Sequence, residues 1–107
     1  MNNATIIEMA PFEIAKGVTS AQLLNASDQL EKGFLEKCEG YIARTLVKTS
    51  DSNYMDIVYW ASMNHAKNAS DKIFESPFCN AYFACMKMSE GVEPQIMHYE
   101  VIGSYSK

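Results

Sequence analysis

Three ionisable side chains lie inside stretches with the alternating pattern of β-strands, and they are the first candidates for chemistry. They are Glu8, Arg44 and His98. A histidine transfers protons near neutral pH, so His98 is the candidate catalytic base if its strand face points toward the helices. The alternative is a histidine hydrogen-bonded at a strand or an interface. Arg44 and Glu8 either bind the polar end of a ligand or pair across the sheet, Arg44 for example with Glu100.

Aromatic and sulfur-containing residues add further candidates. Tyrosines combine an apolar ring with a hydroxyl, which suits either a ligand pocket or an interface anchor; they include Tyr41, Tyr59, Tyr82 and Tyr99. The three cysteines form no CxxC pair, so we expect neither a disulfide framework nor a metal site. No phosphate loop or nucleotide fingerprint is present, and we therefore expect no cofactor.

Composition limits the possible partners. A chain of 107 residues forms one domain, residues 1–107, with 48% hydrophobic residues and a formal net charge of -4. The nine basic residues form no cluster, which argues against a nucleic-acid partner. No segment approaches the ~20 apolar residues of a membrane span, and no secretory start is visible, so we expect a cytoplasmic protein without membrane contact.

The N-terminal half contains a strand and a helix. Residues 5–15 alternate as a strand, with Pro11 at a place that needs no backbone donor. Thr19 and Gln22 have the spacing of a capping box and begin a helix that extends to about Lys37. Gly40 then ends this segment in the left-handed conformation.

The next elements are a hairpin and a helix. Residues 41–48 and 54–60 are rich in β-branched and aromatic residues and flank a polar turn, so they predict two paired strands. The second of these is apolar on both faces and ends at Trp60. Ser62 is the natural N-cap of a helix that extends to about Glu75. Apolar residues at helical spacing, the last of them Ile73 and Phe74, give this helix a face that is expected in the core.

The C-terminal part is more ambiguous. Residues 77–88 favour a short helix, although 81–88 are also compatible with a strand. Residues 89–94 form a loop, and 95–105 alternate as the last strand, in which His98 shares a face with Ile96 and Ile102.

This order predicts an α+β protein with the ferredoxin-like βαββαβ arrangement, in which a four-stranded antiparallel sheet carries its helices on one face. The other face is also apolar and needs a partner. A second copy of the chain, packed sheet to sheet, is the commonest solution, so we expect a homodimer.

With this order established, the chain resembles the antibiotic biosynthesis monooxygenase-like family of the dimeric α+β barrel superfamily. The resemblance covers about residues 8–105. It rests on Phe12 to Gly17 at the end of the first strand, on the Cys38-Glu39-Gly40-Tyr41 segment, and above all on Asp56 to Ser62 followed by Ala66 and Ala69.

The resemblance implies a pocket between the sheet and its helices, with Trp60 as a wall for a small apolar or aromatic ligand. The other pocket candidates are Phe83, Tyr99 and Arg44, and His98 is the proton acceptor. The resemblance also implies a cofactor-independent monooxygenase-like enzyme that acts on a small aromatic or quinol substrate. The alternative is a non-catalytic ligand-binding or structural barrel. Haem degradation is a distant third, because Tyr82 or Phe83 stands where the iron-ligating histidine would fall.

Overall fold

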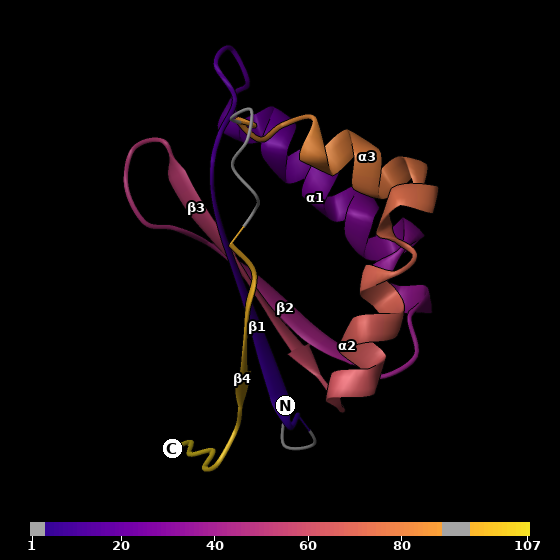
Figure 1. Cartoon of the computed structure of the whole chain (residues 1–107). Helices are drawn as coiled ribbons and strands as arrows, with labels where there is room; N and C mark the ends of the chain where they lie inside the picture. The colour runs from indigo at the N-terminus through magenta and orange to yellow at the C-terminus, as the bar shows by residue number, and fades with distance from the viewer. Residues whose placement is uncertain (1–3, 89–94) are drawn as a thin grey trace.

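The computed structural model describes residues 4–88 and 95–107 (Figure 1). Its strands are β1 (Ile6–Glu13), β2 (Tyr41–Lys48), β3 (Asn53–Trp60) and β4 (Met97–Glu100). Its helices are α1 (Ser20–Gly33), α2 (Met63–Ser70) and α3 (Pro77–Phe83), with two short 3₁₀ helices, η1 (Leu35–Lys37) and η2 (Ile73–Glu75).

The strands form one antiparallel sheet in the order β2-β3-β1-β4, and the helices lie together on one side of it (Figure 1). This confirms the predicted ferredoxin-like α+β arrangement. β2 and β4 are the two edges, and β1 and β3 lie between them.

The core lies between the helices and one face of the sheet. β3 shows the pattern most clearly, because every second side chain from Tyr54 to Trp60 is buried and those between are only half-buried. Leu23 and Leu30 of α1 and Tyr82 of α3 belong to the same buried cluster. Alternation along a strand places successive side chains on opposite faces, so this pattern identifies the helix-facing side.

The predicted helix starts and the glycine stop are confirmed. The Thr19 hydroxyl accepts the Gln22 N–H at 3.1 Å, and the Gln22 side chain accepts the Thr19 N–H at 2.9 Å. Ser62 accepts the N–H of His65 at 3.2 Å. Gly40 has a φ of 80°, which is readily adopted only without a Cβ. Local side-chain chemistry therefore fixes where these elements begin and end.

Both long helices are shorter than predicted. α1 ends at Gly33, and a 3₁₀ turn continues the chain to Lys37. The ring of Phe78 lies too close to Gly33 for a Cβ to fit between them, so this glycine lets α3 pack closely at the end of α1. α2 ends at Ser70, and Phe74, which was expected in the core stripe, is 78% exposed.

One uncertainty in the C-terminal part is resolved. Within residues 77–88 the short helix forms, as α3, and the competing strand is limited to a single bridge between Met86 and Ile14. The predicted loop at 89–94 lies outside the described residues.

The last strand is much shorter than the predicted 95–105. β4 pairs with the first half of β1, and its last residue lies opposite Ile6, where β1 begins. One further bond joins the N–H of Val101 to the carbonyl of Thr5 at 2.8 Å. A strand needs a partner for its backbone groups, and β1 offers none to the residues that follow.

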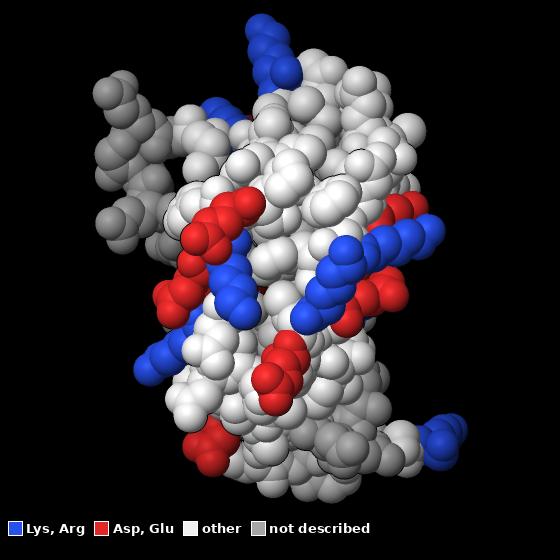
Figure 2. Space-filling model, turned by 90° about the vertical axis from the view of Figure 1, so that its right-hand side faces the viewer, with Lys and Arg blue, Asp and Glu red and all other residues white. Residues whose placement is uncertain are grey.

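The outer surface of the helix layer carries charges of both signs. Figure 2 shows acidic and basic side chains interspersed in a band across this face, with uncharged areas above it. Over the described part of the chain, no helix has the length and apolar character needed to cross a bilayer.

Candidate functional site

The strand register places most of the predicted functional residues on the helix-facing side of the sheet. Residues directly opposite each other on neighbouring strands share a face. Val58 of β3 lies opposite both Glu8 and Arg44, and Glu8 in turn lies opposite His98. Because Val58 is buried in the core, His98, Glu8 and Arg44 form one row on its side of the sheet, with Trp60 one step further along β3.

The side chain of Arg44 is the centre of a buried polar network, which we call the inner cluster; it comprises Arg44, Asp56, Tyr82, Ser27, Glu31 and Tyr41. Arg44 Nε donates to Asp56 Oδ1 at 2.9 Å, and Nη2 donates to the Ser27 hydroxyl at 2.7 Å. Nη1 donates to the Ser27 carbonyl at 3.3 Å and to Glu31 at 3.4 Å. The Arg44 side chain is only 5% exposed, so its charge is neutralised inside the protein.

Two tyrosines complete the inner cluster. The Tyr82 hydroxyl donates to Asp56 Oδ2 at 2.6 Å, and the guanidinium carbon of Arg44 lies 5.1 Å from the centre of the Tyr82 ring. The Tyr41 hydroxyl donates to Glu31 at 2.5 Å. The inner cluster thereby connects β2 and β3 to α1 and α3.

Burial and the neighbouring carboxylates set the protonation states in this cluster. Burial and then the Asp56 carboxylate raise the pKa of Tyr82 far above its usual value. For Tyr41, burial and the hydrogen bond to Glu31 act in the same direction and raise the pKa. Burial disfavours the charge of Arg44, but the Asp56 carboxylate outweighs this effect and raises the pKa of Arg44. Both phenols thus remain protonated while Arg44 stays charged.

A second polar pair lies at the other side of the same face. His98 Nε2 and Glu8 Oε1 are 3.0 Å apart, and their side chains are 26% and 20% exposed. When Nε2 carries the proton, it donates to Glu8, and Nδ1 is the ring nitrogen that accepts a proton. A carboxylate that orients an imidazole in this way is a common arrangement for a general base.

Trp60 is a core residue in this structure. It is 2% exposed, and its ring lies 5.8 Å from that of Tyr41 in an edge-on arrangement. Among the described residues nothing accepts a hydrogen bond from its indole N–H. A buried donor without a partner is unfavourable by about 1 to 3 kcal/mol, which makes this N–H a candidate contact for a ligand acceptor.

The other predicted pocket residues lie elsewhere. Tyr99 is on the opposite face of the sheet, across from Ile7, and is 48% exposed. Phe83 ends α3 and packs partly against the core, with its ring 6.4 Å from that of Phe74. Two surface hollows of about 280 and 600 Å³ include none of the five predicted site residues.

The sequence matches no protein-family model and no curated protein. The fold, however, has clear counterparts among solved structures. An antibiotic biosynthesis monooxygenase candidate from Bordetella bronchiseptica superposes with a TM-score of 0.74 at 15% identity, over 92% of this chain and 98% of that chain. The chain has the fold of the antibiotic biosynthesis monooxygenase-like proteins.

Two further structures with this fold are of proteins named as oxygenases. SnoaB, a cofactor-independent oxygenase from Streptomyces nogalater, has a TM-score of 0.73 at 13% identity and covers 97% of this chain and 99% of its own. A monooxygenase from Streptomyces coelicolor, solved with the ligand nanaomycin D, has a TM-score of 0.68 at 9% identity, over 100% of this chain and 96% of that chain. Identities this low demonstrate a shared fold and leave the chemistry to the site.

Sequence reasoning missed the partners of Arg44. Glu100, the suggested partner, lies on β4, whereas Arg44 lies on β2 at the opposite edge of the sheet. The true partner, Asp56, did carry a signal, because it alternates with Tyr54 and Val58 on the buried face of its strand. A carboxylate in such a position needs a cation or several donors, and the paired strand offers two basic residues on that face, Arg44 and Lys48, on either side of the residue opposite Asp56. The structure pairs Asp56 with Arg44.

Proposed function

We propose that this protein is a homodimeric, cofactor-independent monooxygenase-like enzyme that acts on a small aromatic or quinol substrate. The observation that supports this most strongly is the hydrogen-bonded pair of His98 and Glu8 on the helix-facing side of the sheet. The fold is one that cofactor-independent oxygenases use. In this proposal His98 is the proton acceptor, Glu8 orients it, and Trp60 and Phe83 are walls of the substrate pocket.

The chemistry requires little from the protein beyond a base and a dry site. His98 removes a proton from a phenolic substrate with an activated ring methylene, and the resulting anion gives an electron to O₂. The two radicals combine into a hydroperoxide at the former methylene carbon. Loss of water then leaves a carbonyl, so one oxygen atom enters the product and the other leaves in water. All the electrons come from the substrate.

Two residues take the roles that their environments favour. Arg44 acts indirectly, because its donors are occupied within the inner cluster, and it holds the sheet and helices that surround the site. Tyr99 is assigned to the dimer interface, the second of its two predicted roles, since it lies on the open face of the sheet.

Oxygen consumption with the anthrone dithranol tests the enzymatic proposal. Wild-type protein is expected to consume one O₂ per anthraquinone formed, well above the rate in buffer. His98→Gln is expected to lower that rate by about 10²- to 10⁴-fold, as removal of a general base does. The matched control is His65→Gln, because His65 contacts Ser62 in the first turn of α2, away from the proposed base. Equal rates for the wild type and His98→Gln would remove the basis for this assignment.

The dimer is tested through the open face of the sheet. Its half-buried residues Ile7, Met9, Met55, Ile57 and Tyr59 lie on β1 and β3, in the centre of the sheet. Wild-type protein is expected to have twice the 12.0 kDa chain mass by light scattering. Ile57→Lys places a charge in the proposed interface and is expected to give the single-chain mass with an unchanged far-UV spectrum. A single-chain mass for the wild type would contradict the proposal.

The second candidate is a non-catalytic barrel, which either binds a small ligand or is structural. It is favoured by the 2% exposure of Trp60 and by the internal pairing of every charge around Arg44. A ligand-binding barrel is expected to show saturable quenching of the Trp60 fluorescence by dithranol, and a structural barrel no quenching. In both cases no variant changes the oxygen consumption. The same assay therefore separates the two candidates.

A further inference from the structure

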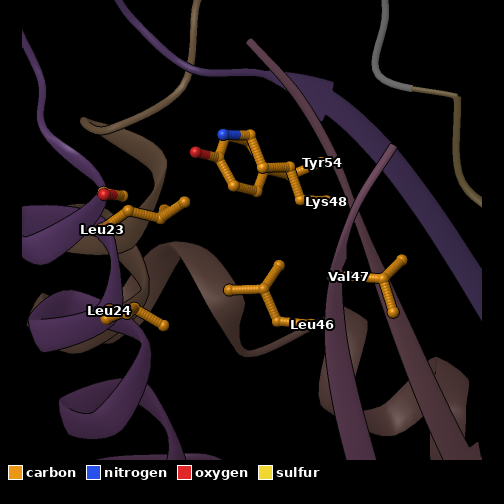
Figure 3. Close-up of a pocket in the computed structure, with 7 residues that line it drawn as sticks. Leu23, Leu24, Leu46, Val47, Lys48 and Tyr54 are labelled. Carbon is orange, nitrogen blue, oxygen red and sulfur yellow. The ribbon is translucent and has the colours of Figure 1, made fainter. Parts of the chain in front are cut away.

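The smaller of the two surface hollows lies where the start of α1 meets the hairpin of β2 and β3, and it does not include the proposed base (Figure 3). Its volume is about 280 Å³. The residues that line it are Ser20, Leu23, Leu24, Leu46, Val47, Lys48 and Tyr54. It lies beside Tyr54 near the start of β3, whereas Trp60 ends that strand, so the length of the strand separates this hollow from Trp60.

The walls of this hollow are almost entirely apolar. Figure 3 shows Leu23 and Leu24 of α1 on one side, with Leu46 of β2 and Tyr54 of β3 facing them. Leu23 and Tyr54 are only 1% and 7% exposed and form fixed walls, while Leu24 is 54% exposed. Water gains little in such a hollow, and an apolar group that displaces it gains the free energy of burial.

One cation stands at the edge of this apolar surface. Lys48 Nζ lies 5.9 Å from the centre of the Tyr54 ring, and Lys48 is exposed. In the described ranges, 4–88 and 95–107, no carboxylate lies within ion-pair distance of Lys48. An ammonium group beside an apolar hollow complements a ligand that has an apolar body and one anionic end.

We propose that this hollow binds a small monocarboxylate whose hydrocarbon part packs against Leu23, Leu24 and Tyr54 and whose carboxylate pairs with Lys48. The volume lies just below the ~300 Å³ at which ligand pockets usually begin, so it fits one short chain rather than a peptide helix. This site is additional to the proposed oxygenase site. It does not depend on His98, and neither result decides the other.

Titration with octanoate, followed by ¹H–¹⁵N amide shifts of the full chain, tests the site. Saturable shifts are expected at the amides of Leu23, Leu24 and Leu46, with none at His98. Each buried methylene contributes about 0.8 kcal/mol, or about fourfold in affinity, so hexanoate, which is two methylenes shorter, is expected to bind about 16-fold more weakly. Shifts without saturation, or confined to the His98 side of the sheet, would overturn the proposal.

Charge and shape are tested separately. Lys48→Gln is expected to weaken octanoate binding by about threefold, as loss of an exposed ion pair does, while Lys67→Gln on α2 leaves it unchanged. Leu24→Trp fills the mouth of the hollow and is expected to abolish the saturable shifts. Octylamine binding as tightly as octanoate would refute the role of Lys48, and unimpaired binding by Leu24→Trp would refute the location.

Discussion

Two carboxylates on the same face of the sheet have opposite environments. Asp56 and Arg44 are 2.9 Å apart with side chains 9% and 5% exposed, whereas Glu8 and His98 are 3.0 Å apart with side chains 20% and 26% exposed. The two pairs flank Val58, which lies opposite Glu8 on one side and Arg44 on the other. Distance alone does not distinguish them.

Burial and connectivity do distinguish the two pairs. Asp56 and Arg44 are bonded to α1, through Ser27, and to α3, through Tyr82, so they hold the helix layer on the sheet. Removing either side chain leaves the other as a buried charge that has neither solvent nor an ionic partner. Glu8 and His98 connect only two neighbouring strands and remain in contact with solvent. The first pair therefore serves stability, and the second is the pair to which we assign the proposed proton transfer.

The largest expected effect of breaking this contrast is at Asp56. Asp56→Ala leaves the buried guanidinium of Arg44 without its main counter-charge and is expected to reduce the free energy of unfolding by about 3 to 5 kcal/mol. Urea unfolding at neutral pH measures it. The matched variant Glu8→Gln is expected to change stability by less than about 1 kcal/mol, because that pair is partly solvated. Similar losses for the two variants would erase the distinction.

A smaller effect is expected at Tyr82. Tyr82→Phe removes the hydroxyl that donates to Asp56 Oδ2 and leaves that buried oxygen with one partner fewer. We expect a loss of about 1 to 3 kcal/mol in the same urea experiment. Tyr105→Phe, at a tyrosine that is 95% exposed, is the control and should be close to neutral. A neutral Tyr82→Phe would mean that the inner cluster does not depend on this bond.

The raised pKa of Tyr82 also predicts how stability depends on pH. Below the usual tyrosine pKa of about 10, the folded and unfolded chains both hold the proton, and the contribution is constant. Above it the unfolded chain releases the proton while the folded chain retains it, so stability falls as pH rises. Tyr41 acts in the same direction. Tyr82→Phe should therefore show a shallower fall in urea midpoint above about pH 10 than wild type.

Much of the fold was predictable because local chemistry specifies it. The capping box at Thr19, the N-cap at Ser62 and the glycine at position 40 each act within a few residues, and each was predicted correctly. The length of the last strand was not predictable in this way. Residues 95–105 alternate well, but pairing ends where β1 begins at Ile6, and that limit comes from another part of the chain.

The candidate site was predictable only in part, for the same reason. His98 and Glu8 were each recognised as charges within strands, but their pairing follows from the β1–β4 register. For Arg44 the sequence predicts a ligand contact or a cross-strand pair, for example with Glu100. It does not show that α1 brings Ser27 to Arg44 or that α3 brings Tyr82 to the Asp56 carboxylate. Tyr99 alternates with His98 and therefore lies on the opposite face of β4.

The most direct test of the proposed catalytic pair, His98 and Glu8, is a double-mutant cycle. It measures oxygen consumption for His98→Gln, Glu8→Gln and the double variant. If Glu8 acts by orienting His98, Glu8→Gln should lower the wild-type rate about tenfold and should have no effect in the His98→Gln background. Rate losses that multiply in the double variant, or a Glu8→Gln protein as active as wild type, would contradict the proposal that Glu8 orients His98.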